Sequence, residues 1–208
     1  MGAEQERGLE TNFARITGRV LAESTVSHKT YGETFYIVVV GIERKSGYED
    51  AIKVMVSERL TWDIDLQPGA MVSVCGQVRT YNEEEEDGRS HLNIVIFARE
   101  FGLVPEDAAY ENEIYLAGFV CKPPIRRTSP LGREICDIML AVNRMYNKSD
   151  YIPCIAWGRN AAYAGVLEVG TKMIITGRIQ SREYRKRDEI GNSIAKMAYE
   201  VSVLKIEE

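Results

Sequence analysis

The chain has 208 residues, 45% of them hydrophobic and 27% charged, which is typical of a folded globular protein with one large domain or two small ones. No apolar run is long enough to span a bilayer, and the first ten residues hold no apolar segment for export, so we expect a cytoplasmic protein without a membrane contact. The formal net charge of −5 argues against nucleic-acid binding, but it hides an asymmetry. Residues 1–109 have 11 Lys and Arg against 19 Asp and Glu, whereas residues 110–208 have 15 against 12. This asymmetry predicts different partners for the two halves.

The residue types that catalyse reactions or bind metals do not show the spacing of a known catalytic or metal site. The four cysteines lie in or beside apolar runs without the close spacing of a metal site, and we interpret them as buried reduced thiols: Cys75, Cys121, Cys136 and Cys154. The sequence contains no nucleophile with its base, no P-loop and no dinucleotide fingerprint. We therefore expect a protein that is not an enzyme and has no cofactor and no metal.

The two halves repeat one unit at an offset of 100 residues. Gly18 matches Gly118, the segment "FYIVVVGIER" matches "ICDIMLAVNR", and "DAIKVMV" matches "DYIPCIA". One further residue of offset aligns "LQPGAMVSVCGQVRTY" with "LEVGTKMIITGRIQSR". The repeat predicts two tandem domains, residues 1–104 and residues 111–208, with "FGLVPEDAAYEN" as the linker.

The second copy predicts its elements in a clear order along the chain. They are a strand at 114–121, an irregular arm at 122–132, a strand at 134–143, a loop at 144–150, a strand at 151–157, a short helix at 159–168, a strand at 172–181, a hairpin loop at 182–192 and a strand at 193–203. The first copy follows the same order, with Trp62 packed in its helix segment. Three strands, a helix and two strands form the OB-fold. The expected fold class is all-β with short helices, as two tandem OB-fold five-stranded Greek-key barrels; another small barrel or sandwich is the alternative.

The third predicted strand separates two kinds of side chain. Because successive strand residues point to opposite faces, two sets result: Tyr151, Pro153, Ile155 and Trp157 on one face, and Ile152, Cys154 and Ala156 on the other. The second set is small and aliphatic and suits a core. The first set brings a Tyr and a Trp close to several cations, which a core does not require.

Comparison with the first copy indicates where the aromatic residues lie. Four aromatic positions have no ring in the first copy: Tyr146, Tyr151, Trp157 and Tyr184 correspond to Ser46, Ala51, Ser57 and Glu83. Matched core positions stay apolar, as Ile52 and Ile152 do. The four aromatic side chains are therefore expected on a surface. Two alternatives stay open: Trp157 caps the barrel end, or Tyr184 is a solvated loop residue.

Basic residues accompany these aromatic residues in the arm, the loops and the strand ends. Those expected to contact a nucleic acid are Arg126, Arg127, Arg133, Arg144, Lys148, Arg159, Arg178 and Arg182. Single-stranded nucleic acid suits such a surface, because every base has a face that can stack and cations neutralise the phosphates. Stacking does not distinguish DNA from RNA, so both stay open as ligands.

The second copy resembles the bacterial single-stranded DNA-binding proteins in "IYLAGFVCKPPIRRTSPLGREICDIMLAVNR", "DYIPCIAWGRNAA" and "GTKMIITGRIQSREY". The resemblance covers nearly all of residues 113–203 and implies an OB-fold that stacks single-stranded DNA on Tyr146, Tyr151, Trp157 and Tyr184. It implies a nucleoid-associated role in replication, recombination or repair, with proteins of those processes as partners. A homodimer would present four OB-folds, and we expect that assembly. The alternative is an OB-fold protein-interaction or primosome module with weak nucleic-acid binding.

The corresponding hairpin of the first copy, "YNEEEEDGR", holds five successive carboxylates that would repel a phosphate backbone. One interpretation is a solvated loop. The sharper hypothesis is mimicry, in which Glu83–Glu86 cover the basic groove of the second domain until DNA displaces them. In both cases we expect the first domain to be mainly an assembly or spacing module.

Overall fold

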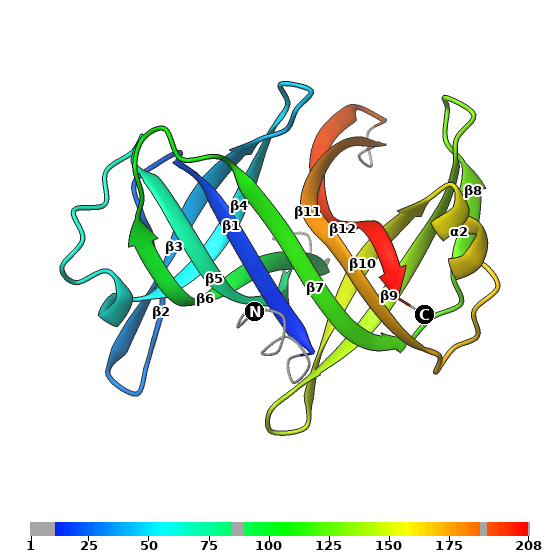
Figure 1. Cartoon of the computed structure of the whole chain (residues 1–208), viewed down its shortest axis with the longest axis horizontal. Helices are drawn as coiled ribbons and strands as arrows, with labels where there is room; N and C mark the ends of the chain where they lie inside the picture. The colour runs from blue at the N-terminus through cyan, green and yellow to red at the C-terminus, as the bar shows by residue number, and fades with distance from the viewer. Residues whose placement is uncertain (1–10, 85–89, 188–190, 208) are drawn as a thin grey trace.

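The computed structural model describes residues 11–84, 90–187 and 191–207, which form two β-barrels side by side (Figure 1). The strands of the first barrel are β1 (Asn12–Val20), β2 (Thr25–Thr30), β3 (Glu33–Glu43), β4 (Glu49–Ser57), β5 (Met71–Glu84) and β6 (Ser90–Leu103). Those of the second are β7 (Glu111–Val120), β8 (Ile125–Thr128), β9 (Glu134–Arg144), β10 (Lys148–Trp157), β11 (Lys172–Arg187) and β12 (Ser193–Glu207). One short helix separates the third and fourth barrel strands of each copy: η2 (Glu58–Leu60) and α2 (Arg159–Ala164).

The same pairings close both barrels. In the first barrel β1 pairs with β3, and in the second β7 pairs with β9. The last strand pairs in parallel with the strand before the helix, β6 with β4 and β12 with β10. This is the five-stranded Greek-key pattern of the OB-fold, with β2 and β8 extending the sheet edges, so the predicted fold class is confirmed.

The core follows the predicted alternation along β10. Ile152, Cys154 and Ala156 are buried at 0%, 3% and 0% exposure, whereas Tyr151 and Trp157 are exposed at 53% and 37%. The rings therefore point away from the barrel interior, so Trp157 does not act as a buried cap. Ile155, on the outer face, is also buried, where β12 pairs beside it.

Gly18 lies where β1 crosses β3, and Gly118 lies where β7 crosses β9. A Cβ on Gly18 would clash with the carbonyl oxygen of Gly41, and one on Gly118 would clash with that of Ala141. Only glycine permits this close backbone approach, which explains why both copies carry it.

Two segments predicted as irregular are in fact strands. The arm at 122–132 contains β8, which pairs with β9 from Ile125 opposite Asp137 to Thr128 opposite Glu134. The hairpin loop at 182–192 is mostly ladder, since β11 continues to Arg187 opposite Ser193. Both segments are polar on both faces, so the apolar periodicity on which the prediction depended is absent there.

The helix predicted for the first copy is reduced to the single 3₁₀ turn η2. Ser57 caps it by accepting a hydrogen bond from the Arg59 backbone N–H at 3.2 Å. The following residues "TWDIDLQPG" lack the alanines that support α2 and include a proline. The expectation that Trp62 packs in this segment is wrong, because its side chain is 83% exposed.

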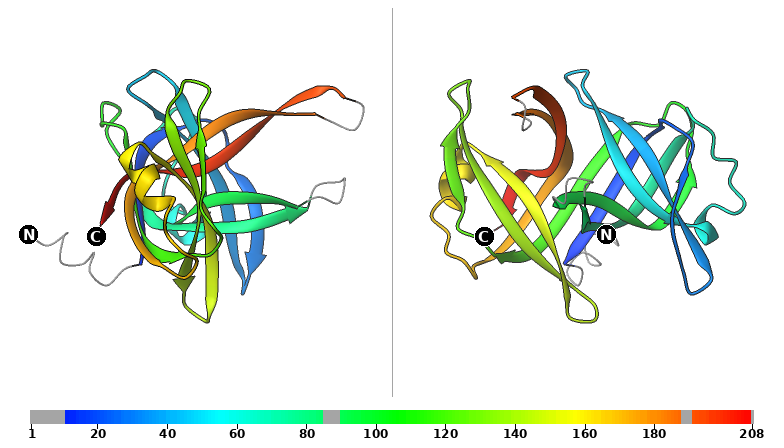
Figure 2. Two further views of the ribbon diagram at one scale, coloured as in Figure 1. Left: turned by 90° about the vertical axis from the view of Figure 1, so that its right-hand side faces the viewer. Right: turned by 180° about the vertical axis from the view of Figure 1, so that it is seen from behind.

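The two barrels share one continuous sheet. Strands β1 and β7 pair antiparallel from Asn12 opposite Leu116 to Thr17 opposite Glu111, which joins all twelve strands. The long hairpins β5–β6 and β11–β12 extend away from the barrels on the same side (Figure 2). Within the described residues, no helix is long and apolar enough to cross a membrane.

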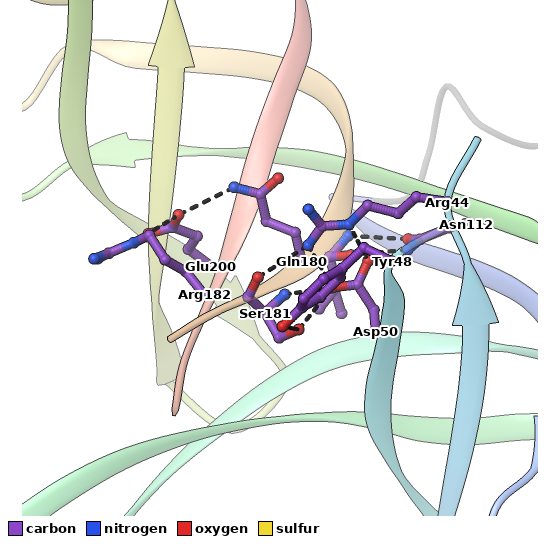
Figure 3. A network of polar contacts seen from close by, with 9 residues as sticks. Arg44, Tyr48, Asp50, Asn112, Gln180, Ser181, Arg182 and Glu200 are labelled. Carbon is purple, nitrogen blue, oxygen red and sulfur yellow. Dashed lines mark hydrogen bonds and ion pairs between the residues drawn. The ribbon is translucent and has the colours of Figure 1, made fainter. Parts of the chain in front are cut away.

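A polar network ties β4 of the first barrel to β11 of the second (Figure 3). Asp50 accepts hydrogen bonds from the backbone N–H and hydroxyl of Ser181 at 2.7 and 2.8 Å. Arg44 donates to both oxygens of the same carboxylate, from Nε at 2.6 Å and from Nη2 at 2.5 Å. Burial opposes ionisation of this carboxyl, but the Arg44 and Ser181 donors outweigh it and lower the pKa of Asp50.

The repeat places a related contact on the other side of the junction. Asp150, also fully buried, accepts a hydrogen bond from the Thr80 backbone N–H at 2.9 Å. Its second oxygen has no hydrogen-bond partner and lies 3.5 Å from Arg144 Nε. The junction therefore has approximate twofold symmetry, with unequal bonding on the two sides.

Candidate nucleic-acid interface

Four of the predicted site residues meet in one cleft of the second domain. Trp157, at the end of β10, lines a hollow of about 570 Å³ together with Arg133, Arg178 and Arg182. The arginines come from the turn before β9 and from β11. Arg178, Gln180 and Arg182 are alternate residues of β11, so their side chains all lie on its outer face. An indole side chain thus opens onto a cleft in which the second domain places three guanidinium groups.

The charges in this cleft, called here the Trp157 cleft, are incompletely paired. Arg182 Nε lies 3.6 Å from Glu200, which also accepts a hydrogen bond from the Gln180 amide at 3.1 Å. Arg178 Nε is buried without a hydrogen-bond partner. An unpaired buried donor is costly and is commonly satisfied by a bound group, so the cleft suits an anionic ligand.

Three other predicted residues lie together at the β9–β10 turn. Tyr146, Arg144 and Lys148 line a second cleft, of about 680 Å³, which also includes first-domain residues. Tyr146 is 87% exposed and has a φ of +64°. A tyrosine in this left-handed region costs about 1 kcal/mol, so the turn presents the ring in spite of the local backbone preference.

Tyr151 and Tyr184 are outside both linings. Tyr151 is on the outer face of β10 near the junction, and its backbone N–H donates to the Thr80 hydroxyl at 3.1 Å. Tyr184 lies in the protruding part of β11, opposite Lys196, and its side chain is half-buried rather than solvated in a loop. The four aromatic residues are therefore spread over the second domain and do not form one cluster.

The predicted arm cations are engaged with neighbouring carboxylates. Arg126 pairs with Glu134, and Arg127 donates to both oxygens of Asp137 at 2.5 and 3.0 Å. Arg126 packs over Gly165 beside α2, on the face of β8 opposite Arg127. Arg159 is exposed at the start of α2. Arg126 and Arg127 therefore already have carboxylate partners, whereas Arg159 is open to solvent.

Sequence reasoning missed the first-domain residues that reach these clefts. Arg44 lines the Trp157 cleft, where it donates to Asp50 and lies over the Tyr48 ring. Arg79 and Arg99 line the cleft beside Tyr146. Strand alternation could have placed Arg79 on an outer face, but only the pairing of β1 with β7 brings that face against the second domain.

The described cysteines are free, and burial raises the pKa of the Cys154 thiol, which keeps it protonated and unreactive. Among the described residues, no group of three His, Cys, Asp or Glu side chains could hold a metal ion. Of the acidic run Glu83–Glu86, only the Glu83 side chain is described; it is exposed and accepts a hydrogen bond from the Asn93 amide of its own domain at 2.9 Å. The covering contact predicted for the rest of this run falls outside the described residues.

The model of the "Single-strand binding protein family" matches residues 111–207. The matched segment is the second domain, and the first domain lies outside it. The chain is similar to "Single-stranded DNA-binding protein 2" of Listeria innocua, with 33% identity over 84 residues that cover 37% of this chain and 53% of that protein. It is also similar to "Single-stranded DNA-binding protein A" of Bacillus subtilis, with 32% identity over 83 residues, 36% of this chain and 48% of that protein. The chain spans about half the length of the curated relatives it matches.

Both domains together share their fold with a solved two-domain structure. The wild-type single-stranded DNA binding protein from Thermus aquaticus superposes with a TM-score of 0.71 and 19% identity, covering 94% of this chain and 91% of that one. At this identity the likeness concerns the fold. Because the superposition covers nearly all of both chains, it includes both barrels of this one.

Proposed function

We propose that the protein binds single-stranded DNA without strong sequence preference, through the outer face of its second domain, in replication, recombination or repair. The observation that carries the proposal is the Trp157 cleft, where an outward indole lies with Arg133, Arg178 and Arg182. The family of the second domain supports DNA as the ligand. Stacking contributes roughly 1–3 kcal/mol per base, and phosphate contacts add a salt-dependent part.

In this proposal the protein acts by binding and not by catalysis, within the cytoplasm and at the nucleoid. The bases of the strand stack on Trp157 and on the tyrosines of the same domain. The arginines around the indole neutralise phosphates that follow each stacked base. Tyr151 and Trp157 extend from the paired strand β10, so the backbone that carries these two rings needs little ordering on binding.

The first domain has the same barrel but lacks the aromatic positions, and we propose that it serves assembly or spacing. A homodimer would then present four OB-folds to one strand. Sedimentation at micromolar concentration tests this assembly. We expect twice the mass of the chain, and a monomer would contradict the proposed dimer.

The binding itself is tested with Trp157→Ala and labelled oligo-dT, followed by fluorescence anisotropy. We expect the affinity to fall by about 1–3 kcal/mol, which corresponds to one lost stacking platform. Trp62→Ala is the matched control, because Trp62 is 83% exposed in the first domain and lines neither cleft. If the unaltered protein does not bind oligo-dT at low salt, the alternative of a protein-interaction or primosome module is favoured instead.

A further inference from the structure

The cleft beside Tyr146 is built by both domains, and we call it the junction cleft. The first domain contributes Thr11, Gln77, Arg79 and Arg99, and the second contributes Asn143, Arg144, Met145, Tyr146 and Lys148. The hollow has a volume of about 680 Å³. Its walls are held together by the β1–β7 ladder and by Asp150 and Tyr151, whose contacts reach Thr80 on β5.

The junction cleft concentrates positive charge. Three arginines and one lysine line it, and its described lining contains no carboxylate. Arg79 Nε and Arg144 Nε are each buried without a hydrogen-bond acceptor. Burial, followed by the repulsion of Arg144 and Arg99, lowers the pKa of Arg79, while Asp150 acts in the opposite direction. The protein thus keeps several guanidinium groups close together, with donors left unsatisfied.

The contacts that Arg79 makes within the protein do not account for its partly buried charge. Its Nη2 donates to Gln77 at 2.7 Å and its guanidinium lies 5.4 Å from the centre of the Phe97 ring, but these contacts do not satisfy Nε or the charge. At the equivalent position the second domain has Gln180, which lies opposite Glu200 and donates to it. Opposite Arg79 the first domain has Val95. The first domain therefore carries a cation where the second carries a polar pair that is already satisfied.

The lining residues select the chemistry of the ligand. Guanidinium groups bind phosphate oxygens with directed hydrogen bonds, and Tyr146 at the rim offers a ring for a base. Arg79 and Arg144 also line a groove of about 780 Å³ on the first domain, which includes Tyr81 and Phe97. A chain of alternating phosphates and bases fits a cationic cleft that continues into a groove with aromatic side chains.

We propose that the junction cleft is a phosphate-binding site for the single strand, and that the strand passes through it from the second domain onto the first. This inference rests on the proposed function, because it requires the strand to bind the second domain. It gives Arg79 and Arg99 a direct part in binding, in addition to the assembly or spacing role of their domain.

The test compares Arg79→Gln combined with Arg99→Gln against the unaltered protein. The Arg79 change introduces the residue type that the second domain carries at Gln180, so the barrel is expected to fold, and thermal melting verifies it. Binding is measured by anisotropy over a series of salt concentrations with two oligo-dT lengths. One has about 8 nucleotides, within the range that a single OB-fold covers, and one has about 30 nucleotides, enough for two OB-folds.

We expect the double variant to bind the long strand about tenfold more weakly, with the salt slope reduced by about 0.7 for each lost phosphate contact. The short strand should lose much less, because the second domain alone can hold it. Arg59→Gln is the control, since this first-domain arginine is exposed on η2 and pairs with Glu33 away from the junction cleft. It should change neither affinity nor slope.

The outcomes separate the inference from the function on which it rests. Normal binding of the long strand by the double variant, with the salt slope of the unaltered protein, would overturn the junction site and leave the proposed function standing. No binding of either strand by the unaltered protein would overturn both. If the double variant does not fold, Arg99→Gln alone decides, because Arg99 is exposed and its loss leaves the core intact; an unchanged slope then counts against the site.

Discussion

The two domains of this chain have equivalent cores but different outer faces. Ile52 and Ile152 are buried at equivalent positions, at 1% and 0% exposure. The outer face has changed its use: Trp157 opens onto a cationic cleft, whereas Ser57 at the matching position caps η2 and bonds Glu33. The interior therefore specifies the barrel, while the outer residues specify what the barrel contacts.

The junction shows the same principle in its charged groups. Both domains carry a buried aspartate and an arginine six residues before it, Arg44 with Asp50 and Arg144 with Asp150. On one side the carboxylate is fully engaged by Arg44 and Ser181. On the other side, Arg144 Nε lies 3.5 Å from the Asp150 carboxylate, and Arg144 lines the junction cleft. One copy of the pair thus stabilises the interface, and the other leaves its cation accessible to a ligand.

Breaking the stronger of these two contacts should have the greatest consequence for stability. Asp50→Asn should lower the free energy of unfolding by about 3 kcal/mol, because it leaves Arg44 without its buried partner. Asp150→Asn should cost only about 1 kcal/mol, since one of its oxygens has no hydrogen bond to lose. Urea unfolding of the two variants measures both values. Equal losses would contradict the inequality of the two sides.

Acid should erase the Asp50 contribution. The pKa of this carboxyl is lower in the folded protein than in the unfolded chain, so its stabilisation is complete above about pH 4 and is lost as the pH falls through the folded value. The stability difference between the unaltered protein and Asp50→Asn should therefore shrink in acid. Unfolding curves taken at neutral pH and near pH 3 compare the two proteins. A difference that stays constant would show that Asp50 acts through packing and not through its charge.

The strand order, the core of β10 and the outward position of Trp157 could be predicted from the sequence, because alternation and the repeat act over short distances. Neighbours that come from the other domain could not. Nothing local to Asp50 indicates Ser181, and nothing local to Arg79 indicates Tyr146, since both pairs depend on the joining of β1 to β7. The extent of β11 was missed because its outer half is polar on both faces.

Replacing aromatic side chains by their first-domain counterparts tests the comparison on the outer face. Tyr151→Ala and Tyr146→Ser should each weaken oligo-dT binding by about 1 kcal/mol, the lower end of a stacking contribution, because both rings are exposed. Their unfolding free energy should hardly change. Anisotropy and thermal melting give the two readouts. A variant that melts early and binds normally would place that ring in packing.

The smallest expected effect concerns the acidic run of the first domain. Replacing Glu83–Glu86 with Gln should tighten DNA binding at low salt if these carboxylates compete with phosphate for the basic groove. The gain should disappear at high salt. Anisotropy with oligo-dT at both salt concentrations measures it, and unchanged affinity would leave the run as a solvated hairpin.

The two tryptophans give each domain its own fluorescent reporter of DNA contact, since each domain has one. Trp62→Phe leaves Trp157 as the only fluorescent indole, and Trp157→Phe leaves Trp62. Titration of both proteins with oligo-dT should quench Trp157 strongly at low salt and weakly at high salt, and should leave Trp62 unchanged. A folded protein in which Trp157 is not quenched, or in which only Trp62 is quenched, would contradict the assignment of DNA binding to the outer face of the second domain.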